Sequence, residues 1–288
     1  MARLRLLVAE GNVRETRERV ARLTGATPAE GYARVLARLA PDAAVDIVHP
    51  ADPGANLPGP AGLADYDGVA ITGSALNVHK GEPASLAQVE FARAIFEAGV
   101  PFFGSCWGLQ VATVAAGGTV RTNPAGREVG FARKVWLTPA GLEHPMHAGR
   151  PPVYDAPAVH ADEVGTIAPG TTVTATNALS EVQAAEIRHG NGVFWGVQYH
   201  PEYTLLDVIG VLERYRPILL AEGLILNDEA LDGMCADLRA LHAEPSRRDL
   251  AWRYGLDGDI TDPDRRSIDL RNWIERQVRP AAAARGRG

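Results

Sequence analysis

The stretch Pro101-Phe102-Phe103-Gly104-Ser105-Cys106-Trp107-Gly108-Leu109-Gln110 joins an apolar strand pattern to a helical pattern at a single cysteine. Gly104 and Gly108 stand two residues before and two residues after Cys106, as small residues do around a nucleophile elbow. We therefore expect a sharp strand-to-helix turn that lifts the Cys106 side chain away from the backbone. The partial positive charge of a helix N-terminus would also favour a thiolate over a thiol. The stretch predicts an α/β fold with a reactive cysteine after a strand.

A second motif lies much further along the chain. Residues 193–202 indicate a strand that ends in His200, with Glu202 two residues later and Pro201 stiffening the link. Glu202 can then bind one imidazole nitrogen while the other nitrogen faces Cys106, which makes these three side chains a candidate catalytic triad. An inert, buried cysteine is the alternative interpretation of Cys106 alone. The flanking glycines and the second motif favour a nucleophile.

The N-terminal part of the chain alternates short apolar runs with helical patterns, which is typical of a parallel sheet covered by helices. The expected strands are residues 3–9, 45–48, 67–72 and 101–104, with a helix at residues 32–39. Ser85 and Gln88 predict a capping box at the start of a further helix, which Gly99 ends. Residues 119–197 change to strand pairs with Gly and Pro turns, among them a hairpin at residues 182–197. Antiparallel strands are thus added to a parallel core.

Beyond residue 204 the pattern is helical. The expected helices cover residues 205–220, broken or kinked near Pro217, a segment that begins near Asn227 or Asp228, and residues 267–278. Residues 280–288 are expected to fray. We divide the chain into a domain of residues 1–204 and a C-terminal helical extension of residues 205–288. The apolar stripes of this extension fit packing on the chain's own core, and a docking or dimer surface is the alternative.

The composition excludes several classes of protein. Of 288 residues, 46% are hydrophobic and 22% are charged, which allows an ordinary core and excludes disordered and disulfide-scaffold proteins. The formal net charge of −6 offers no field for phosphate backbones, so nucleic acid is not an expected partner. No apolar run approaches the roughly 18 residues of a membrane span. With two cysteines, and with Arg3 and Arg5 interrupting the first apolar stretch, we expect a cytoplasmic protein.

Together the two motifs resemble those of the class I glutamine amidotransferases, which include the glutaminase domain of GMP synthase and related free-standing proteins. The resemblance rests on residues 104–110 and on Tyr199-His200-Pro201-Glu202, and it extends from the first strand to about Tyr203. It implies a flavodoxin-like α/β fold, in which helices flank a mixed and mainly parallel sheet.

The resemblance also assigns roles to the triad. It implies that Cys106 attacks the side-chain amide of glutamine, with His200 as general base and Glu202 as the partner that orients it. Ser105 departs from the family, which more often has a β-branched or other apolar residue there. We regard this departure as adjacent to the chemistry rather than part of it.

The same resemblance implies an oxyanion hole. Its donors would be the backbone N–H of Trp107 and the turn that contains Gly73 and Ser74, and such donors stabilise charge that exists only in the transition state. The turn reads Gly-Ser-Ala where many relatives have Gly-Gly-Pro or Gly-Ser-Pro. We therefore expect a looser turn, able to rest in an inactive orientation without a partner.

Positions that contact glutamine in the family match this chain more weakly. The resemblance assigns this role to Gln110, Ala161 and Asp162, and a polar strand edge is the alternative interpretation of His160 and Asp162. His144 and His147 have the residue type of metal ligands but lack companions at ligand spacing, so we expect no metal there. A loop near the entrance of the site is the favoured interpretation of these two histidines.

The sequence contains none of the motifs that bind ATP or a dinucleotide. We therefore expect no cofactor, and ammonia released here would be used by a separate synthetase subunit or lost. The leading hypothesis is a glutaminase that forms a γ-glutamyl thioester on Cys106 and releases glutamate and ammonia. A hydrolase of other γ-glutamyl amides or peptides is the first alternative, with Trp107 and residues 10–31 shaping the leaving-group side. A binding module without turnover is the second.

Overall fold

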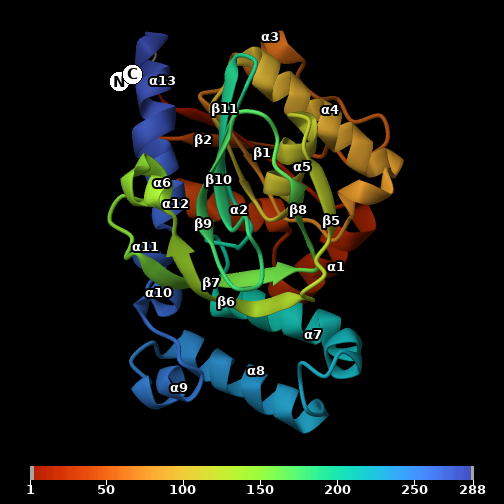
Figure 1. The fold of residues 1–288 in the computed structure, drawn as a ribbon, viewed down its shortest axis with the longest axis vertical. Helices are drawn as coiled ribbons and strands as arrows, with labels where there is room; N and C mark the ends of the chain where they lie inside the picture. Colours follow the sequence, from red (N-terminus) through yellow and green to blue (C-terminus); the bar gives the residue numbers. More distant parts are fainter. Residues whose placement is uncertain (1–2, 287–288) are drawn as a thin grey trace.

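The computed structural model of the chain describes residues 3–286 (Figure 1). The strands are β1 (Arg5–Ala9), β2 (Ala44–Val48), β3 (Gly68–Ile71), β4 (Phe102–Ser105), β5 (Thr119–Thr122), β6 (Glu128–Leu137), β7 (Val153–His160), β8 (Asp162–Thr166), β9 (Thr171–Thr176), β10 (Ala184–His189) and β11 (Gly192–Val197). The helices of the first part are α1 (Arg14–Thr24), α2 (Pro28–Leu39), α3 (Pro60–Leu63), η1 (Val78–Lys80), α4 (Pro83–Ala98), α5 (Trp107–Ala115), α6 (Pro139–Glu143) and η2 (Pro145–His147). Those of the second part are α7 (Leu205–Ala221), α8 (Asp228–Ala243), α9 (Arg248–Arg253), α10 (Gly258–Thr261), α11 (Pro263–Arg266), α12 (Ile268–Trp273), η3 (Ile274–Val278) and α13 (Arg279–Ala284).

A nine-stranded mixed sheet forms the centre, in the order β2-β1-β3-β4-β11-β10-β9-β6-β7, and β5 pairs separately with β8. The strands from β2 to β11 in this order run parallel. The pairs from β11 onward to β7 are antiparallel. The expected α/β fold, a mixed sheet flanked by helices with antiparallel strands added to a parallel core, is confirmed.

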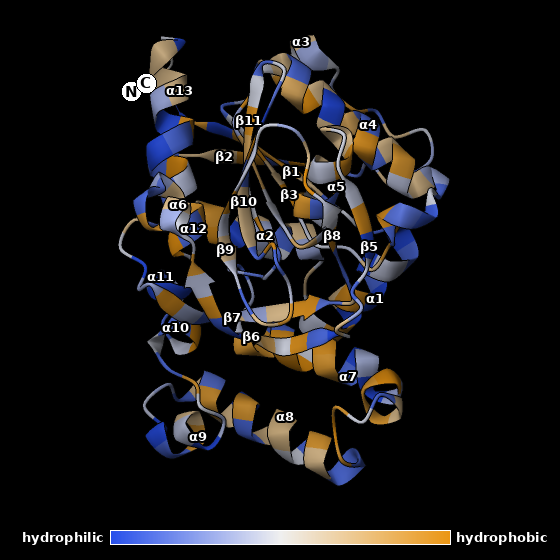
Figure 2. Cartoon of the chain, in the orientation of Figure 1, coloured by the Kyte–Doolittle hydropathy of each residue, from blue (hydrophilic) through white to orange (hydrophobic). Residues whose placement is uncertain are grey.

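The side chains of β1 show how helices come to cover both faces of this sheet. Leu6 and Val8 belong to one core cluster and Leu7 to another, because successive side chains of a strand point to opposite faces. The first cluster contains Leu36 of α2, and the second contains Phe96 of α4. Figure 2 shows the matching pattern in the helices, since α4 and α8 carry alternating hydrophobic and hydrophilic bands.

The parallel strands β1, β3, β4 and β11 end at one edge of the sheet. The residues that directly follow them are Glu10, Thr72, Cys106 and Gln198. Backbone hydrogen bonds join these ends, since Thr72 N donates to Ala9 O and Cys106 N donates to Val197 O at 2.7 Å. Open α/β sheets bind ligands at this edge, so the fold brings Cys106 to the expected location of a site.

Two details of the N-terminal half differ from the sequence analysis. Helix α1 occupies part of residues 10–31, where the pattern predicts no helix. The capping box is wrong: α4 begins at Pro83, whose fixed φ suits the first helical turn. Within the described residues, the Ser85 hydroxyl is buried without a partner, and the Gln88 side chain instead donates to Gly11 O at 3.0 Å.

The helices after residue 204 pack in two places. Helices α7 to α10 form a third core cluster with Phe131 of β6. Helices α12 and α13 enter the first cluster, where Trp273 and Ala282 are fully buried together with Leu36. The apolar stripes of this segment therefore cover the chain's own core. The division at residues 204 and 205 remains a proposal about organisation, since α12 and α13 share a core with the first strands.

Two local expectations for the C-terminal segment also differ. Helix α7 continues through Pro217 as one helix to Ala221. Helix α13 lies where fraying is expected, because Ala282 packs into the core and holds the helix in place. The last two residues of the expected tail, 287–288, lie outside the described part of the chain.

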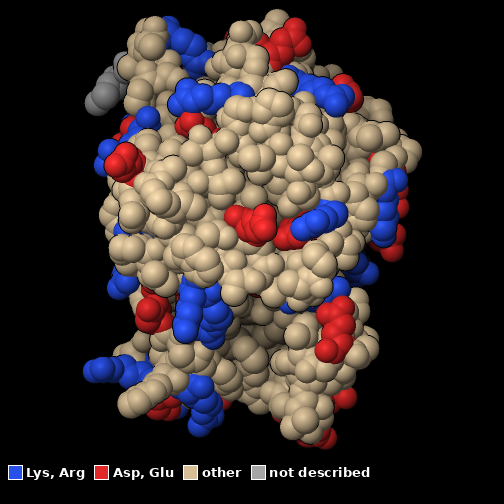
Figure 3. All heavy atoms as spheres, viewed as in Figure 1, with Lys and Arg blue, Asp and Glu red and all other residues tan. Residues whose placement is uncertain are grey.

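The surface offers no extended charged face in the view of Figure 3. Acidic and basic side chains are interspersed there, and a wide area over the sheet carries few charges. Of the helices within residues 3–286, none combines the length and the apolar character needed to cross a membrane.

Candidate active site

The turn at Cys106 is strained. Its φ of 51° and ψ of −96° lie outside the regions that side-chain-bearing residues prefer, at the junction of β4 and α5. A Cβ atom at Gly104 would lie 2.7 Å from the Gly108 backbone, so the turn closes only with glycine at that position. The predicted sharp strand-to-helix turn is confirmed. Strain of this kind is concentrated at functional sites, where the surrounding structure holds it.

His200 and Glu202 lie just beyond the end of β11. The His200 N–H donates to Pro157 O at 2.7 Å, and the ring atom Nδ1 lies 2.7 Å from Glu202 Oε1. The ring is enclosed on one face and at its Cε1 edge. Tyr203 stacks on it at 3.9 Å with an angle of 11° between the planes, and a Cβ atom at Gly73 would come within 2.5 Å of its Cε1 atom. The imidazole therefore has little freedom to rotate.

The charges around His200 favour its protonated form. Burial lowers the pKa of this ring, but Glu202 and Cys106 raise it, and the resulting pKa is about 9. The Nε2 atom is buried and has no well-formed hydrogen bond within the described residues. The Cys106 thiol lies 3.5 Å from the carbonyl oxygen of Val159. The arrangement brings a thiol, an imidazole and a carboxylate together, as the two sequence motifs require.

Ser105 contacts this arrangement directly, through Glu202. Its hydroxyl donates to Glu202 Oε2 at 2.9 Å and lies 3.1 Å from the Tyr32 hydroxyl of α2. Because an ionised carboxylate only accepts, Tyr32 must donate to Ser105. The carboxylate of Glu202 is thus held at both oxygens. The signal in the sequence is the departure itself, a hydroxyl where relatives have an apolar side chain.

Asn12 holds the turn that contains Gly73 and Ser74. Its Nδ2 donates to Gly73 O at 3.2 Å, and its Oδ1 accepts from Ala75 N at 3.0 Å. Glu10 in turn accepts from the Asn12 backbone and side chain, both at 2.9 Å. Burial raises the pKa of Glu10. The Gly-Ser-Ala turn is therefore pinned by a buried network from the end of β1, which sequence reasoning missed because the partners are far apart in the chain.

The Trp107 side chain is packed inside the protein. It is fully buried, and its indole N–H donates to Gln88 Oε1 at 2.7 Å. Within the described residues Trp107 does not line the cavity beside the site. The expectation that its side chain shapes a leaving-group pocket is wrong.

The structure brings Gln110, Ala161 and Asp162 together, with Gln110 and Asp162 buried and Ala161 half-buried. Gln110 Nε2 donates to the Asp162 carbonyl oxygen at 3.2 Å. The Asp162 carboxylate accepts from Asn77 Nδ2 at 2.6 Å and lies 3.3 Å from His79 Nδ1. That carboxylate is therefore already engaged. Neither sequence nor motif spacing indicates these two partners.

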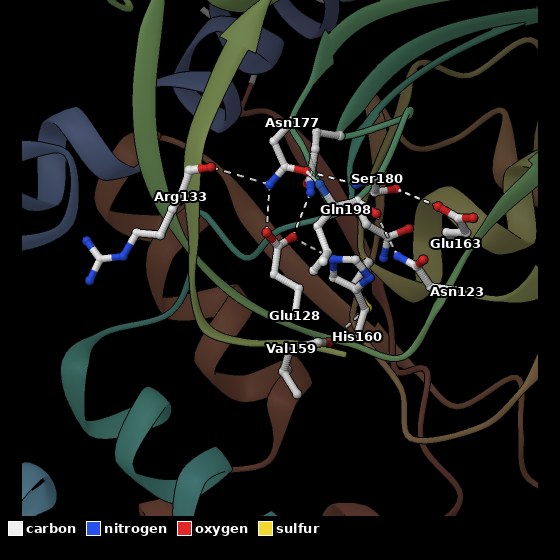
Figure 4. Close-up of polar contacts among 12 residues, drawn as sticks. Asn123, Glu128, Arg133, Val159, His160, Glu163, Asn177, Ser180 and Gln198 are labelled. Carbon is white, nitrogen blue, oxygen red and sulfur yellow. Dashed lines mark hydrogen bonds and ion pairs between the residues drawn. The ribbon is translucent and has the colours of Figure 1, made fainter. Parts of the chain in front are cut away.

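His160 anchors a buried polar network behind the site. Its Nε2 atom lies 2.8 Å from Glu128 Oε2, and Asn177 and Gln183 donate to the same carboxylate, each at 2.6 Å. Figure 4 shows Glu128 between Asn177 and His160, with Val159 next to them along the strand. Because Val159 contacts the thiol, this network fixes one wall around Cys106.

The other two histidines do not form an entrance loop. His147 is buried, with Nδ1 3.1 Å from Asp269 and Nε2 2.9 Å from Thr174, and His144 packs on the Trp195 ring. In the part of the chain that the structure describes, neither lines the cavity beside His200. Residues 3–286 contain no group of three His, Cys, Asp or Glu side chains that could hold a metal ion.

A cavity of about 310 Å³ lies beside the His200 ring. At its inner end it is lined by Gly73, Ser74, Val159, His200, Glu202 and Tyr203. Cys106 itself is not among the described residues that line the cavity, but its thiol lies next to this inner end, because Val159 and His200 contact it. Helices α1, α2 and α7 supply the outer walls. The expectation that residues 10–31 shape the site fits this lining, which includes Asn12, Val20 and Thr27.

Comparison with known proteins identifies the class of protein that this fold and site define. The family model described as glutamine amidotransferase class-I matches residues 33–207. The chain belongs to this family, which is a family of enzymes, and the expected resemblance is confirmed.

Individual relatives narrow the comparison. A γ-glutamyl-L-1-hydroxyisopropylamide hydrolase from a Pseudomonas species is 36% identical over 287 residues, which cover 98% of this chain and 96% of that protein. A glutamine-hydrolysing GMP synthase from Salmonella arizonae is 34% identical over 193 residues, 63% of this chain and 35% of that enzyme. A solved glutamine amidotransferase from Thermotoga maritima shares the fold, with a TM-score of 0.64, 19% identity, and coverage of 96% of this chain and 99% of that one.

Proposed function

We propose that this enzyme hydrolyses γ-glutamyl amides through a covalent intermediate on Cys106. The observation that carries the proposal is the strained turn at Cys106 beside the His200 and Glu202 pair, two residues that line the inner end of a cavity. A raised pKa of His200, about 9, supports a protonated imidazole at neutral pH beside the Cys106 nucleophile. Such a pair combines an activated nucleophile with a proton ready for the leaving amine.

The proposed reaction has two stages. The Cys106 thiolate attacks the δ-carbonyl carbon, and backbone N–H groups of Gly73, Ser74 and Trp107 stabilise the oxyanion. The C–N bond then breaks, the His200 imidazolium gives its proton to the amine, and a γ-glutamyl thioester remains. Water attacks the thioester while neutral His200 accepts its proton. Glutamate leaves, and the thiolate and imidazolium are restored.

We further propose that the amine of the physiological substrate is larger than ammonia. Ammonia needs little of a cavity of about 310 Å³. The relative that matches nearly the whole chain is named for an amide of a hydroxylated alkylamine, which supports this choice. Gln110, Ala161 and Asp162 are the proposed contacts of the γ-glutamyl group, through their backbone where the side chain is already engaged.

A glutaminase that feeds a synthetase subunit is the second candidate, and the similarity to GMP synthases favours it. It would need a partner protein that takes up the ammonia. A homodimer is a separate prediction. A module without turnover is a weaker candidate, since all three triad residue types are present. We also propose a cytoplasmic location, because both cysteines are free.

The test compares glutamine with γ-glutamyl-1-hydroxyisopropylamide as substrates of the purified chain. We expect release of glutamate from both and a higher kcat/KM for the larger amide. Cys106→Ser should lose roughly 10³-fold or more in kcat, because the nucleophile is removed. Cys235→Ser is the matched control, since Cys235 is the other buried cysteine and is not among the described residues that line the cavity. Equal rates for Cys106→Ser and wild type would refute the proposal.

A further inference from the structure

The cavity beside His200 extends well beyond the reacting atoms, and the C-terminal helices build much of its outer part. Helix α7 contributes Gly210, Val211 and Arg214 to the lining, and α8 contributes His242. The opposite wall comes from α1 and α2. The space runs along α7 from the triad, and Asp207 and Arg214 on this helix are about 10 Å apart along its axis. A leaving amine with an extended body would occupy this space.

Besides histidines, the cationic side chains that line the cavity within residues 3–286 are two arginines, Arg34 and Arg214. Neither forms an ion pair with a described residue. Arg34 is exposed, whereas Arg214 is half-buried, and its Nε atom is buried without a hydrogen bond to any described residue. By contrast Arg216, two residues further on the same helix, pairs with Asp228 and Asp232 at 2.8 and 2.6 Å. The Arg214 guanidinium lies over the Tyr215 ring, 4.8 Å from its centroid, and this contact leaves its N–H groups without an acceptor carboxylate among the described residues. Arg214 is thus the helix arginine whose charge has no ion-pair partner.

The acidic groups of the cavity already have partners. Glu202 is held by His200 and Ser105. Asp207 accepts from the backbone N–H and the hydroxyl of Thr204, both at 2.7 Å, in the capping box of α7. The charge that remains unsatisfied is therefore positive. A buried guanidinium edge without a partner is costly, and a carboxylate is the ligand that best satisfies it.

Between the triad and Arg214 the wall is largely apolar. Leu23 of α1, Val35 of α2 and Val211 of α7 line this stretch. Apolar side chains suit the methylene groups of an alkylamine. They offer no partner to a charged group in the middle of that amine. The arrangement matches an amine whose nitrogen meets the triad, whose body crosses the apolar stretch and whose acidic group reaches the guanidinium.

We propose that the preferred substrates are γ-glutamyl amides of amino acids, and that Arg214 binds the carboxylate of the leaving amine. The proposal rests on the proposed function and adds the chemical class of the amine. It also gives the C-terminal helices a role, because α7 and α8 complete the leaving-group pocket. Reactions that attach the γ-carboxyl group of glutamate to the amino group of an amino acid would supply such substrates.

The test uses γ-glutamyl amides of linear amines with two to five methylene groups, each ending in a carboxylate, a hydroxyl or a methyl group. Glutamine completes the set. At matched length we expect kcat/KM to be about 30-fold higher for the carboxylate than for the hydroxyl, as a charge-assisted hydrogen bond implies. Equal kcat/KM values for the two end groups at every length would overturn the proposal.

Variants of two neighbouring arginines separate recognition from general damage. Arg214→Gln should reduce the carboxylate-to-hydroxyl ratio about 10-fold or more, and Arg214→Lys should restore part of it, because the charge returns without the planar fork. Arg216→Gln is the matched control and should leave the ratio unchanged. The ratio is measured within each variant, so a loss of folded protein does not alter it. An unchanged ratio in Arg214→Gln overturns the proposal. Failure to hydrolyse any member of the set, glutamine included, would refute the proposed function itself.

Discussion

The hydroxyl of Ser105 and the carboxylate of Glu202 form the contact that extends the triad into α2. Ser105→Ala would leave Glu202 Oε2 without its donor in a buried place. Such a loss costs about 1 to 3 kcal/mol, so we expect kcat/KM to fall about 10-fold or more. Tyr32→Phe should cost less, since Tyr32 acts through Ser105.

The control for Ser105 is another buried serine. The Ser85 hydroxyl has no hydrogen-bond partner within the described residues, so Ser85→Ala should leave kcat/KM unchanged. Steady-state kinetics with one γ-glutamyl amide compare the three variants. If Ser105→Ala were as active as Ser85→Ala, the contact with Glu202 would have no role in catalysis.

Glu202 also sets the charge of His200. The pKa of His200, about 9, lies above the ordinary 6.5, so its stabilising effect is complete below about pH 6.5 and is lost as the pH rises through 9. We therefore expect kcat/KM to decline above pH 9, as the imidazolium loses the proton that the leaving amine needs. Glu202→Gln removes a charge that raises this pKa and should move the decline to lower pH. A pH profile that is identical for wild type and Glu202→Gln would contradict this account.

At the scale of elements, the turn after β3 approaches His200 closely at Gly73, and a substitution there tests whether this close packing matters for activity. Gly73→Ala would put a Cβ atom 2.5 Å from His200 Cε1, and both neighbours are fixed by their own contacts. The ring or the turn must move, and we expect a loss of kcat of about 100-fold, comparable to losing an oxyanion donor.

The matched substitution is Gly233→Ala in α8. A Cβ atom there meets nothing within 4 Å, and alanine favours a helix by about 1 kcal/mol. This variant should keep full activity and gain stability by that amount in a denaturant titration. A similar activity for the two alanine variants would show that the turn tolerates displacement from His200.

At the scale of the whole molecule, Asp269 joins the C-terminal helices to the sheet. This fully buried carboxylate of α12 accepts from Arg150 at 2.6 Å and Tyr199 at 3.0 Å and lies 3.1 Å from His147. Burial raises its pKa, but Arg150 and His147 lower it to about 2. Because the folded value is below the ordinary 3.8, the stabilisation is present above about pH 4 and is lost as the pH falls toward 2.

Asp269→Asn should therefore destabilise the whole chain. Removing one charge of a buried pair costs about 3 to 5 kcal/mol, and denaturant unfolding at neutral pH measures it. The control is Asp264→Asn, which breaks the exposed pair between Asp264 and Arg38 and should cost no more than about 1 kcal/mol. Equal costs for the two variants would mean that α12 contributes little to the common core.

The sequence is sufficient for the parallel core and for the hairpin of β10 and β11, and it indicates the three residues of the proposed triad, because each follows from a local pattern. The contacts of Asn12, Tyr32 and Asp269 could not be predicted from the sequence. These side chains meet partners from distant segments, and only the folded chain decides which ones. The capping box at Ser85 fails for a related reason, since Pro83 and the packing of Gln88 on Gly11 override the local signal.

The central claim is that Cys106 carries the γ-glutamyl group during turnover. Its most direct test is acid quenching of the working enzyme within its first turnovers, followed by intact mass measurement and peptide mapping. The account predicts a γ-glutamyl adduct on Cys106, formed with each substrate that is hydrolysed, and none on Cys235. Turnover without any adduct, or an adduct on another residue, would contradict it.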